Sequence, residues 1–172
     1  IALIYPLIEN NIISERAGLT TFSITGYSGG GRKMIAEYES CKRDKKYGSP
    51  RQYAITQKHK HLKEMMTITG LSYKPMFNPI IDDYFNGMIV TVPLITRALY
   101  KRTSAQHIWE VLSKHYENEH FVKVMPFMGK GIIEDGFLAA NTLAGTNDLQ
   151  IFVFGNDEQV LIASRLDNLG KG

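Results

Sequence analysis

The sequence is poor in cysteine: Cys41 is the only one among its 172 residues. An internal disulfide framework is therefore excluded, and a single thiol is typical of a reducing compartment, usually the cytoplasm. No apolar run approaches the roughly 18 residues that a membrane-spanning helix needs, so we expect no membrane protein. Disorder is excluded too, because 44% of the residues are hydrophobic and 22% are charged, which suffices for one packed domain.

The chain also lacks a large excess of charge of one sign, because its formal net charge is only +3. Positive charge is nevertheless concentrated in one window of the sequence. From Lys42 to Glu64, eight basic residues stand against two acidic ones, a net charge of +6. A solvated basic loop and a local site for an anionic ligand both explain this window. We expect no nucleic-acid partner, because no binding motif appears and only Tyr47 and Tyr53 interleave the basic residues.

The two ends of the chain predict an incomplete domain. Ile1, Ile4 and Leu7 follow helical spacing from the first residue, without a capping residue before them. At the other end, the apolar stretch 149–166 runs into two glycines, which suggests a turn toward a further element. We therefore expect residues 1–172 to form one domain that is incomplete at both ends.

Hydrophobic periodicity predicts more strands than helices. Strands are expected at residues 20–25, 53–57, 87–95 (well buried) and 121–127, with a hairpin of 149–154 and 160–166. Helices are expected at residues 1–8, 32–39 and His61–Thr69, and after a capping box at 103–106. Several strands are joined by short connections. The fold class is therefore α+β, with a mixed, mostly antiparallel sheet and helices packed on one face.

A glycine turn, Gly-Tyr-Ser-Gly-Gly-Gly at residues 26–31, lies between a predicted strand and a predicted helix. Backbone N–H groups and the helix dipole favour an anion at such a place. The turn is not a dinucleotide fingerprint or a P-loop, because it lacks the acidic partner of the first and the Gly-Lys-Ser/Thr of the second. A glycine turn with a purely structural role explains the same sequence as well as an anion site does.

His59 and His61 form a second candidate site. Two histidines one residue apart could bind a metal, but no further ligand at suitable spacing completes such a site, so we predict none. A role for one imidazole as an acid or base near pH 7 is better supported than a metal site. The alternative is that both histidines are surface residues without a functional role. Cys41 lies in a polar loop that offers no oxyanion hole or fixed partner, so we reject it as a nucleophile.

Taken together, these segments resemble the N-acetyl-gamma-glutamyl-phosphate reductases, an NADP-dependent family of arginine biosynthesis. The resemblance covers nearly the whole chain. One departure is Lys63, which stands where the family usually has proline. The matching segments are 23–39 (SITGYSGGGRKMIAEYE), 59–65 (HKHLKEM), 87–94 (GMIVTVPL), 152–160 (FVFGNDEQV) and 165–172 (RLDNLGKG).

The resemblance implies the second domain of a two-domain enzyme, with a fold like the C-terminal domain of aspartate-semialdehyde dehydrogenase and glyceraldehyde-3-phosphate dehydrogenase. In the family this domain binds substrate and forms a homo-oligomer, a dimer or a tetramer. NADP binds mainly to the N-terminal domain, and the nucleophilic cysteine precedes the helix that residues 1–8 resemble. Both are absent from this chain, so we expect no cofactor for it alone and no activity in isolation.

The resemblance also implies roles for individual residues. A histidine, His61 or else His59, handles the proton of the tetrahedral intermediate formed when the cysteine attacks the acyl phosphate. The phosphorylated N-acetyl-glutamate substrate would be bound by a further set: Ser28, Gly29, Gly30, Lys58 and Lys60. The alternative is a non-catalytic remnant of the enzyme that survives as a dimerising scaffold.

Overall fold

The computed structural model describes residues 1–133 and 135–170. It is built on one seven-stranded sheet with strand order β2-β3-β1-β4-β7-β6-β5. The strands are β1 (Thr20–Gly26), β2 (Arg51–Gln52), β3 (Met76–Asp82), β4 (Met88–Ile95), β5 (Val122–Val124), β6 (Leu149–Gly155) and β7 (Gln159–Leu166). The α-helices are α1 (Tyr5–Glu9), α2 (Gly31–Glu39), α3 (His61–Thr69) and α4 (Ala105–His115). Single 3₁₀ turns are η1 (Tyr27–Gly30), η2 (Lys45–Gly48), η3 (Thr96–Ala98) and η4 (Phe127–Gly129).

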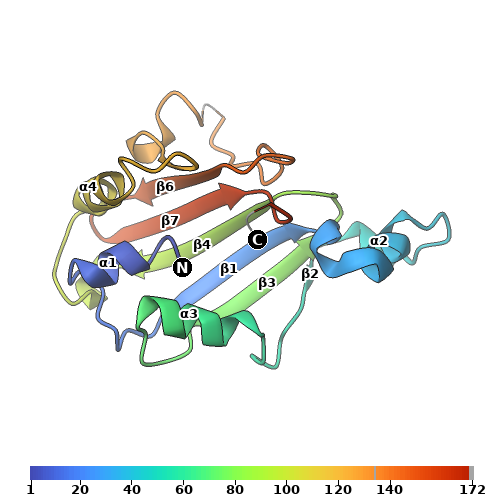
Figure 1. The fold of residues 1–172 in the computed structure, drawn as a ribbon, viewed down its shortest axis with the longest axis horizontal. Helices are drawn as coiled ribbons and strands as arrows, with labels where there is room; N and C mark the ends of the chain where they lie inside the picture. The colour runs from blue at the N-terminus through green and yellow to red at the C-terminus, as the bar shows by residue number, and fades with distance from the viewer. Residues whose placement is uncertain (134, 171–172) are drawn as a thin grey trace.

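The sheet is mixed and mostly antiparallel, as the sequence predicts. The β1–β3 and β5–β6 pairs are parallel, and the other four pairs are antiparallel. The hairpin of β6 and β7 is confirmed, and its turn is fixed by the Asn156 side chain, which accepts from the N–H groups of Glu158 and Gln159. The parallel β1–β3 crossover contains α3 and also α2, which lies beyond the C-terminal end of β1 (Figure 1).

The hydrophobic core lies on one face of the sheet. Helix α1 packs against α4, and α4 contacts β5 and β6. Leu7, Ile108 and Leu112 contribute fully buried side chains from the two helices. The sheet supplies alternate residues of β4, β6 and β7, namely Val92, Leu94, Ile151, Val153, Val160 and Ile162.

The opposite face of the sheet is open over β1, β3 and β4. Phe22 and Ile24 point to this face and are 42% and 38% exposed. The register places Thr91 and Ile89 of β4 beside them. Near β6 and β7, residues 139–142 cover the same face, where Arg165 donates to Thr142 Oγ1 and to the carbonyl of Ala139.

Four local expectations were wrong. The segment 53–57, predicted as a strand, is instead a strained loop that follows the two-residue β2. The strand predicted at 121–127 is shorter and forms only β5, and Pro126 then precedes η4 as its N-cap. The first half of β4 is only half-buried, because no helix among residues 1–133 and 135–170 lies over its open face. Helix α4 is capped by Ser104, whose hydroxyl accepts from the His107 N–H, rather than by Thr103.

Helix α1 is shorter than the expected 1–8, and other expected elements agree with the structure. Helix α3 ends at Gly70, whose left-handed φ of 75° suits a residue without a Cβ. The glycine turn is followed directly by α2. Of the segments that carry the family resemblance, Lys171 and Gly172 lie outside the described residues.

Candidate functional site

The glycine turn forms η1 and ends β1 beside the turn at residues 84–87. The N–H groups of Gly26, Tyr27 and Ser28 donate to carbonyls of that neighbouring turn at 2.9–3.1 Å. The N–H of Gly31 donates to the Ser28 carbonyl. These four donors are therefore used inside the fold and are not free to hold an anion.

Asn168 was not identified from the sequence, yet it fixes the glycine turn. Its Oδ1 accepts from the Gly87 N–H at 2.9 Å, and its Nδ2 donates to Ser28 Oγ at 3.1 Å and to the Gly26 carbonyl at 3.3 Å. Both Asn168 and Ser28 are buried, whereas Gly29 and Gly30 are exposed. Of the three predicted turn residues, the two glycines are thus the ones presented to solvent.

His59 is held by the protein around it. Its Nδ1 accepts a hydrogen bond from the His61 backbone N–H at 3.3 Å, which secures the start of α3. Its ring lies 5.0 Å from the Phe77 ring and 6.1 Å from the Tyr53 ring, measured between centroids. Burial, together with the nearby charges of His61 and Lys60, lowers the pKa of His59, so the ring is neutral at pH 7.

His61 has a different partner. Its Nδ1 lies 3.0 Å from Glu64 Oε2, one helical turn along α3, and both side chains remain about half exposed. The His59 and His61 rings are 4.9 Å apart. Glu64 is a functional candidate that sequence reasoning did not single out, although its position three residues after His61 was the available signal.

The two predicted lysines flank this histidine pair. Lys58 and Lys60 are exposed, and neither forms an ion pair within the described part of the chain. Their charges are therefore uncompensated next to His59 and His61. This agrees with a local anion site, but a solvated basic segment has the same appearance.

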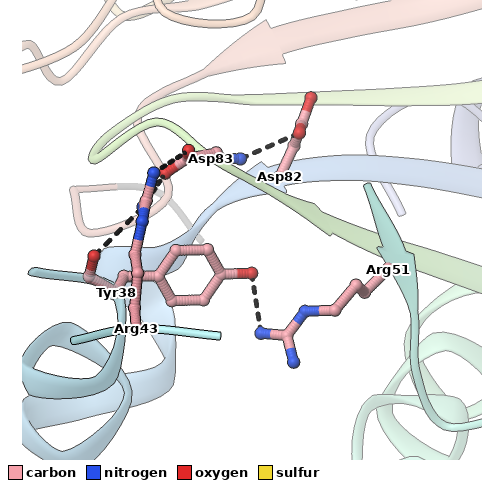
Figure 2. Close-up of polar contacts among 5 residues, drawn as sticks. All are labelled: Tyr38, Arg43, Arg51, Asp82 and Asp83. Atoms are coloured by element: carbon pink, nitrogen blue, oxygen red, sulfur yellow. Dashed lines mark hydrogen bonds and ion pairs between the residues drawn. The ribbon is translucent and has the colours of Figure 1, made fainter. Parts of the chain in front are cut away.

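Two arginines of the basic window, Arg43 and Arg51, belong to an internal cluster around Tyr38, shown in Figure 2. Arg43 forms a bidentate pair with Asp83 at 2.6–2.7 Å and donates to the Tyr38 carbonyl at 3.0 Å. Hydrogen bonding from Arg43 lowers the pKa of Asp83. Arg51 donates to the Tyr38 hydroxyl at 2.8 Å and stacks on the Tyr47 ring at 4.4 Å. The segment 41–50 is thus tied to the fold, and not a free polar loop.

Helix α1 contacts α3, whose first residue is His61. Figure 1 shows the N-terminus close to both helices.

Within residues 1–133 and 135–170, no group of three or more His, Cys, Asp and Glu side chains could hold a metal ion. Over the same residues, the helices are all too short or too polar to cross a membrane. Cys41 is exposed and forms no disulfide there.

These features define a class of protein: an α+β domain with one open sheet face and a histidine pair at the start of a crossover helix. A family model described as "Semialdehyde dehydrogenase, dimerisation domain" matches residues 1–168. The chain belongs to this family.

Individual relatives agree with the family assignment. The N-acetyl-gamma-glutamyl-phosphate reductase 2 of Nostoc sp. is 38% identical over the whole chain, which covers 56% of that protein. The N-acetyl-gamma-glutamyl-phosphate reductase of Trichormus variabilis is 37% identical with the same coverage. The chain therefore spans about half the length of the curated relatives it matches.

Solved structures show the same fold. A probable aspartate-semialdehyde dehydrogenase from Pseudomonas aeruginosa superposes with a TM-score of 0.68 at 14% identity, over 98% of this chain and 54% of that one. At that level of identity the likeness concerns the fold alone. It agrees with the fold type expected from the sequence.

Proposed function

We propose that residues 1–172 are the substrate-binding and dimerisation part of an NADP-dependent reductase. The complete enzyme would convert N-acetyl-glutamyl 5-phosphate to N-acetyl-glutamate 5-semialdehyde in arginine biosynthesis, and we place it in the cytoplasm. The observation that carries the proposal is the His61–Glu64 pair beside His59. It lies in a chain that matches reductases along its full length.

His61 is the proposed acid–base residue. When its Nδ1–H is donated to Glu64, the Nε2 atom is the free nitrogen that can accept or return a proton. His59 is the second choice, because its Nδ1 is already used by the His61 backbone and its lowered pKa disfavours the protonated ring.

The nucleophile would come from residues that precede Ile1 in the complete polypeptide. In the resembled family, the cysteine stands immediately before this helix. The contact between α1 and α3 supports that placement, because His61 is the first residue of α3. There the imidazole could move the proton of a tetrahedral intermediate formed by thiolate attack on the substrate carbonyl.

The first N–H donors of the glycine turn are not free to hold the pyrophosphate of NADP. The glycine turn is the one strand-to-helix glycine motif in the sequence, and its donors at residues 26–28 already bind the carbonyls of the 84–87 turn. A pyrophosphate would need such donors free. We therefore assign NADP binding to the upstream domain.

The substrate's phosphate and carboxylate suit two separate sets of exposed groups, the lysines beside the histidines and the glycine turn at the end of β1. Lys58 and Lys60 supply positive charge without an acidic partner in the described chain. Gly29 and Gly30 are exposed at the start of α2, while Ser28 anchors the turn through Asn168. We propose these five residues as the substrate-binding set, with Ser28 acting through its hold on the turn.

The open sheet face is the proposed surface for a second copy of this chain. It carries apolar side chains that no helix covers, and a two-fold axis would bring the same patch onto itself. An interface of standard size buries about 1,600 Å² in total. The exposed apolar residues of this face are Phe22, Ile24, Met76, Ile95 and Leu161.

A reductase and a non-catalytic dimerising scaffold are separated by one activity measurement. The polypeptide encoded by the complete natural reading frame is assayed with NADPH and N-acetyl-glutamyl phosphate, or in reverse with the semialdehyde. Substrate-dependent turnover supports the reductase, and its absence in a folded, dimeric protein supports the scaffold. Residues 1–172 alone are expected to show no turnover, because the nucleophile is essential to the covalent route.

A further inference from the structure

The Gln57 side chain behaves like an extra residue of the sheet. Its Oε1 accepts from the Phe77 N–H at 3.0 Å, and its Nε2 donates to the Phe77 carbonyl at 2.8 Å. The two-residue strand β2 pairs only with Ile80 and Ile81 of β3. The edge of β3 beyond β2 is therefore completed by a side-chain amide, which satisfies both backbone groups of Phe77.

The backbone that carries Gln57 is strained. Ala54 and Gln57 have φ angles of +50° and +55°, a region that residues with a Cβ seldom adopt. Two such residues lie only three positions apart, and their strained conformations persist when surrounding contacts over-determine them. Backbone strain of this kind is concentrated at functional sites. Here those contacts are the amide pair with Phe77 and the hydrogen bond from the Gln57 N–H to the Ala54 carbonyl, 2.9 Å long.

The contacts continue from this loop to the histidines. The Phe77 side chain is buried, and its ring meets the His59 ring edge-on at 5.0 Å. His59 in turn accepts from the His61 N–H, which sets the first residue of α3. Gln57 thus ties the loop that carries His59 to the β3 residue on which His59 packs.

We propose that Gln57 is a positioning residue for the histidine pair. Its amide holds residues 53–59 in the strained conformation that packs His59 on Phe77 and directs His61 toward Glu64. Gln57 touches neither histidine ring in this role and takes no part in proton transfer. The catalytic consequence rests on the proposed reductase function, whereas the structural consequence does not.

The structural consequence is tested by NMR on residues 1–172. The variants are Gln57→Met, which keeps the length of the side chain but loses both hydrogen bonds, and Gln57→Leu. Release of the loop exposes His59, so its pKa should rise toward the ordinary value of about 6.5. Gln106→Leu, at an exposed position of α4, is the matched control and should leave the His59 titration unchanged. A His59 titration in both Gln57 variants equal to that of the parent overturns the proposal.

The catalytic consequence is tested in the complete polypeptide. Misplacement of a reacting group by about 1 Å can cost roughly 100-fold in rate, so kcat should fall about 10- to 100-fold while KM stays within about threefold. A parent polypeptide without turnover refutes the reductase function but leaves the NMR result standing. A parent with turnover, combined with Gln57 variants of normal kcat, overturns the positioning role.

Discussion

At the scale of single residues, side chains of the same chemical type that lie close together in the sequence have different roles. His59 is packed between two aromatic rings and uses Nδ1 to hold α3, whereas His61 keeps a carboxylate partner and a half-exposed ring. Arg43 is fully engaged by Asp83 and Tyr38, whereas Lys58 and Lys60 have no acidic partner in the described chain. The spacing of the motif suggests which residues matter, but only the contacts separate structural from chemical roles.

Asp167 is a residue whose ionisation should stabilise the fold. Burial raises its pKa, but the N–H groups of Gly145, Leu169 and Gly170 outweigh this effect and lower it below the ordinary value. The contribution is therefore complete above the unfolded pKa of about 3.9 and is lost as the pH falls through the lower folded pKa. Asp167→Asn should cost about 1–3 kcal/mol at pH 7, because hydrogen bonds to a charged acceptor are lost.

Thermal melts between pH 7 and pH 2 check this prediction. The parent should lose stability over the acid range more steeply than Asp167→Asn does. Asp148→Asn, which removes only a surface ion pair with Lys123, is the control and should cost less than about 1 kcal/mol. Parallel pH profiles for the parent and Asp167→Asn would refute the assigned role.

At the scale of secondary-structure elements, the sequence predicts best where periodicity and turn chemistry agree. The hairpin of β6 and β7, helix α3 with its closing glycine, and the strand–turn–helix around η1 are all confirmed. The strand predicted at 53–57 is wrong, because the Gln57 amide replaces backbone pairing and leaves the loop strained. A contact between residues 20 positions apart leaves no trace in local hydrophobic pattern.

The candidate site shows the same division. The glycine turn, the histidine pair and the two lysines follow from motif and charge, since these signals are local in the chain. Asn168 could not be assigned a role from the sequence, because its contacts to Ser28, Gly26 and Gly87 join segments that only the folded sheet brings together. The assignment of catalytic and substrate-binding roles stays a prediction.

The β6–β7 hairpin depends on a glycine at its turn. Gly155 has a φ of +109°, and a Cβ there would collide with the Gln159 carbonyl. Gly155→Ala should therefore destabilise the fold by about 2–4 kcal/mol, through strain and overpacking together. Gly48→Ala is the control, because a Cβ at that position meets open space. Chemical denaturation measures both, and equal midpoints for the two variants would contradict the prediction.

At the scale of the whole molecule, one face of the sheet is covered by helices and the other carries exposed apolar residues. An exposed apolar patch of this kind is typical of a surface that binds another protein surface. We expect the chain to self-associate to about twice 19.4 kDa at micromolar concentration. Phe22→Lys should weaken the association, because two-fold symmetry places the new charge on both copies.

Sedimentation equilibrium measures this association. Phe137→Lys is the control, because Phe137 is 78% exposed but lies outside the sheet, so its replacement should leave the dimer intact. A parent chain found only at 19.4 kDa would contradict the dimer surface. Equal association of the two variants would place the interface elsewhere.

The reductase proposal is tested most directly by the turnover of the complete polypeptide carrying His61→Asn. A positioned acid or base accelerates a reaction by about 10²–10⁴-fold, so kcat should fall by that factor while KM and Tm stay close to the parent values. His120→Asn, at an exposed position beyond α4, is the matched control. A kcat within about threefold of the parent, well below the range expected of acid–base catalysis, would contradict the account.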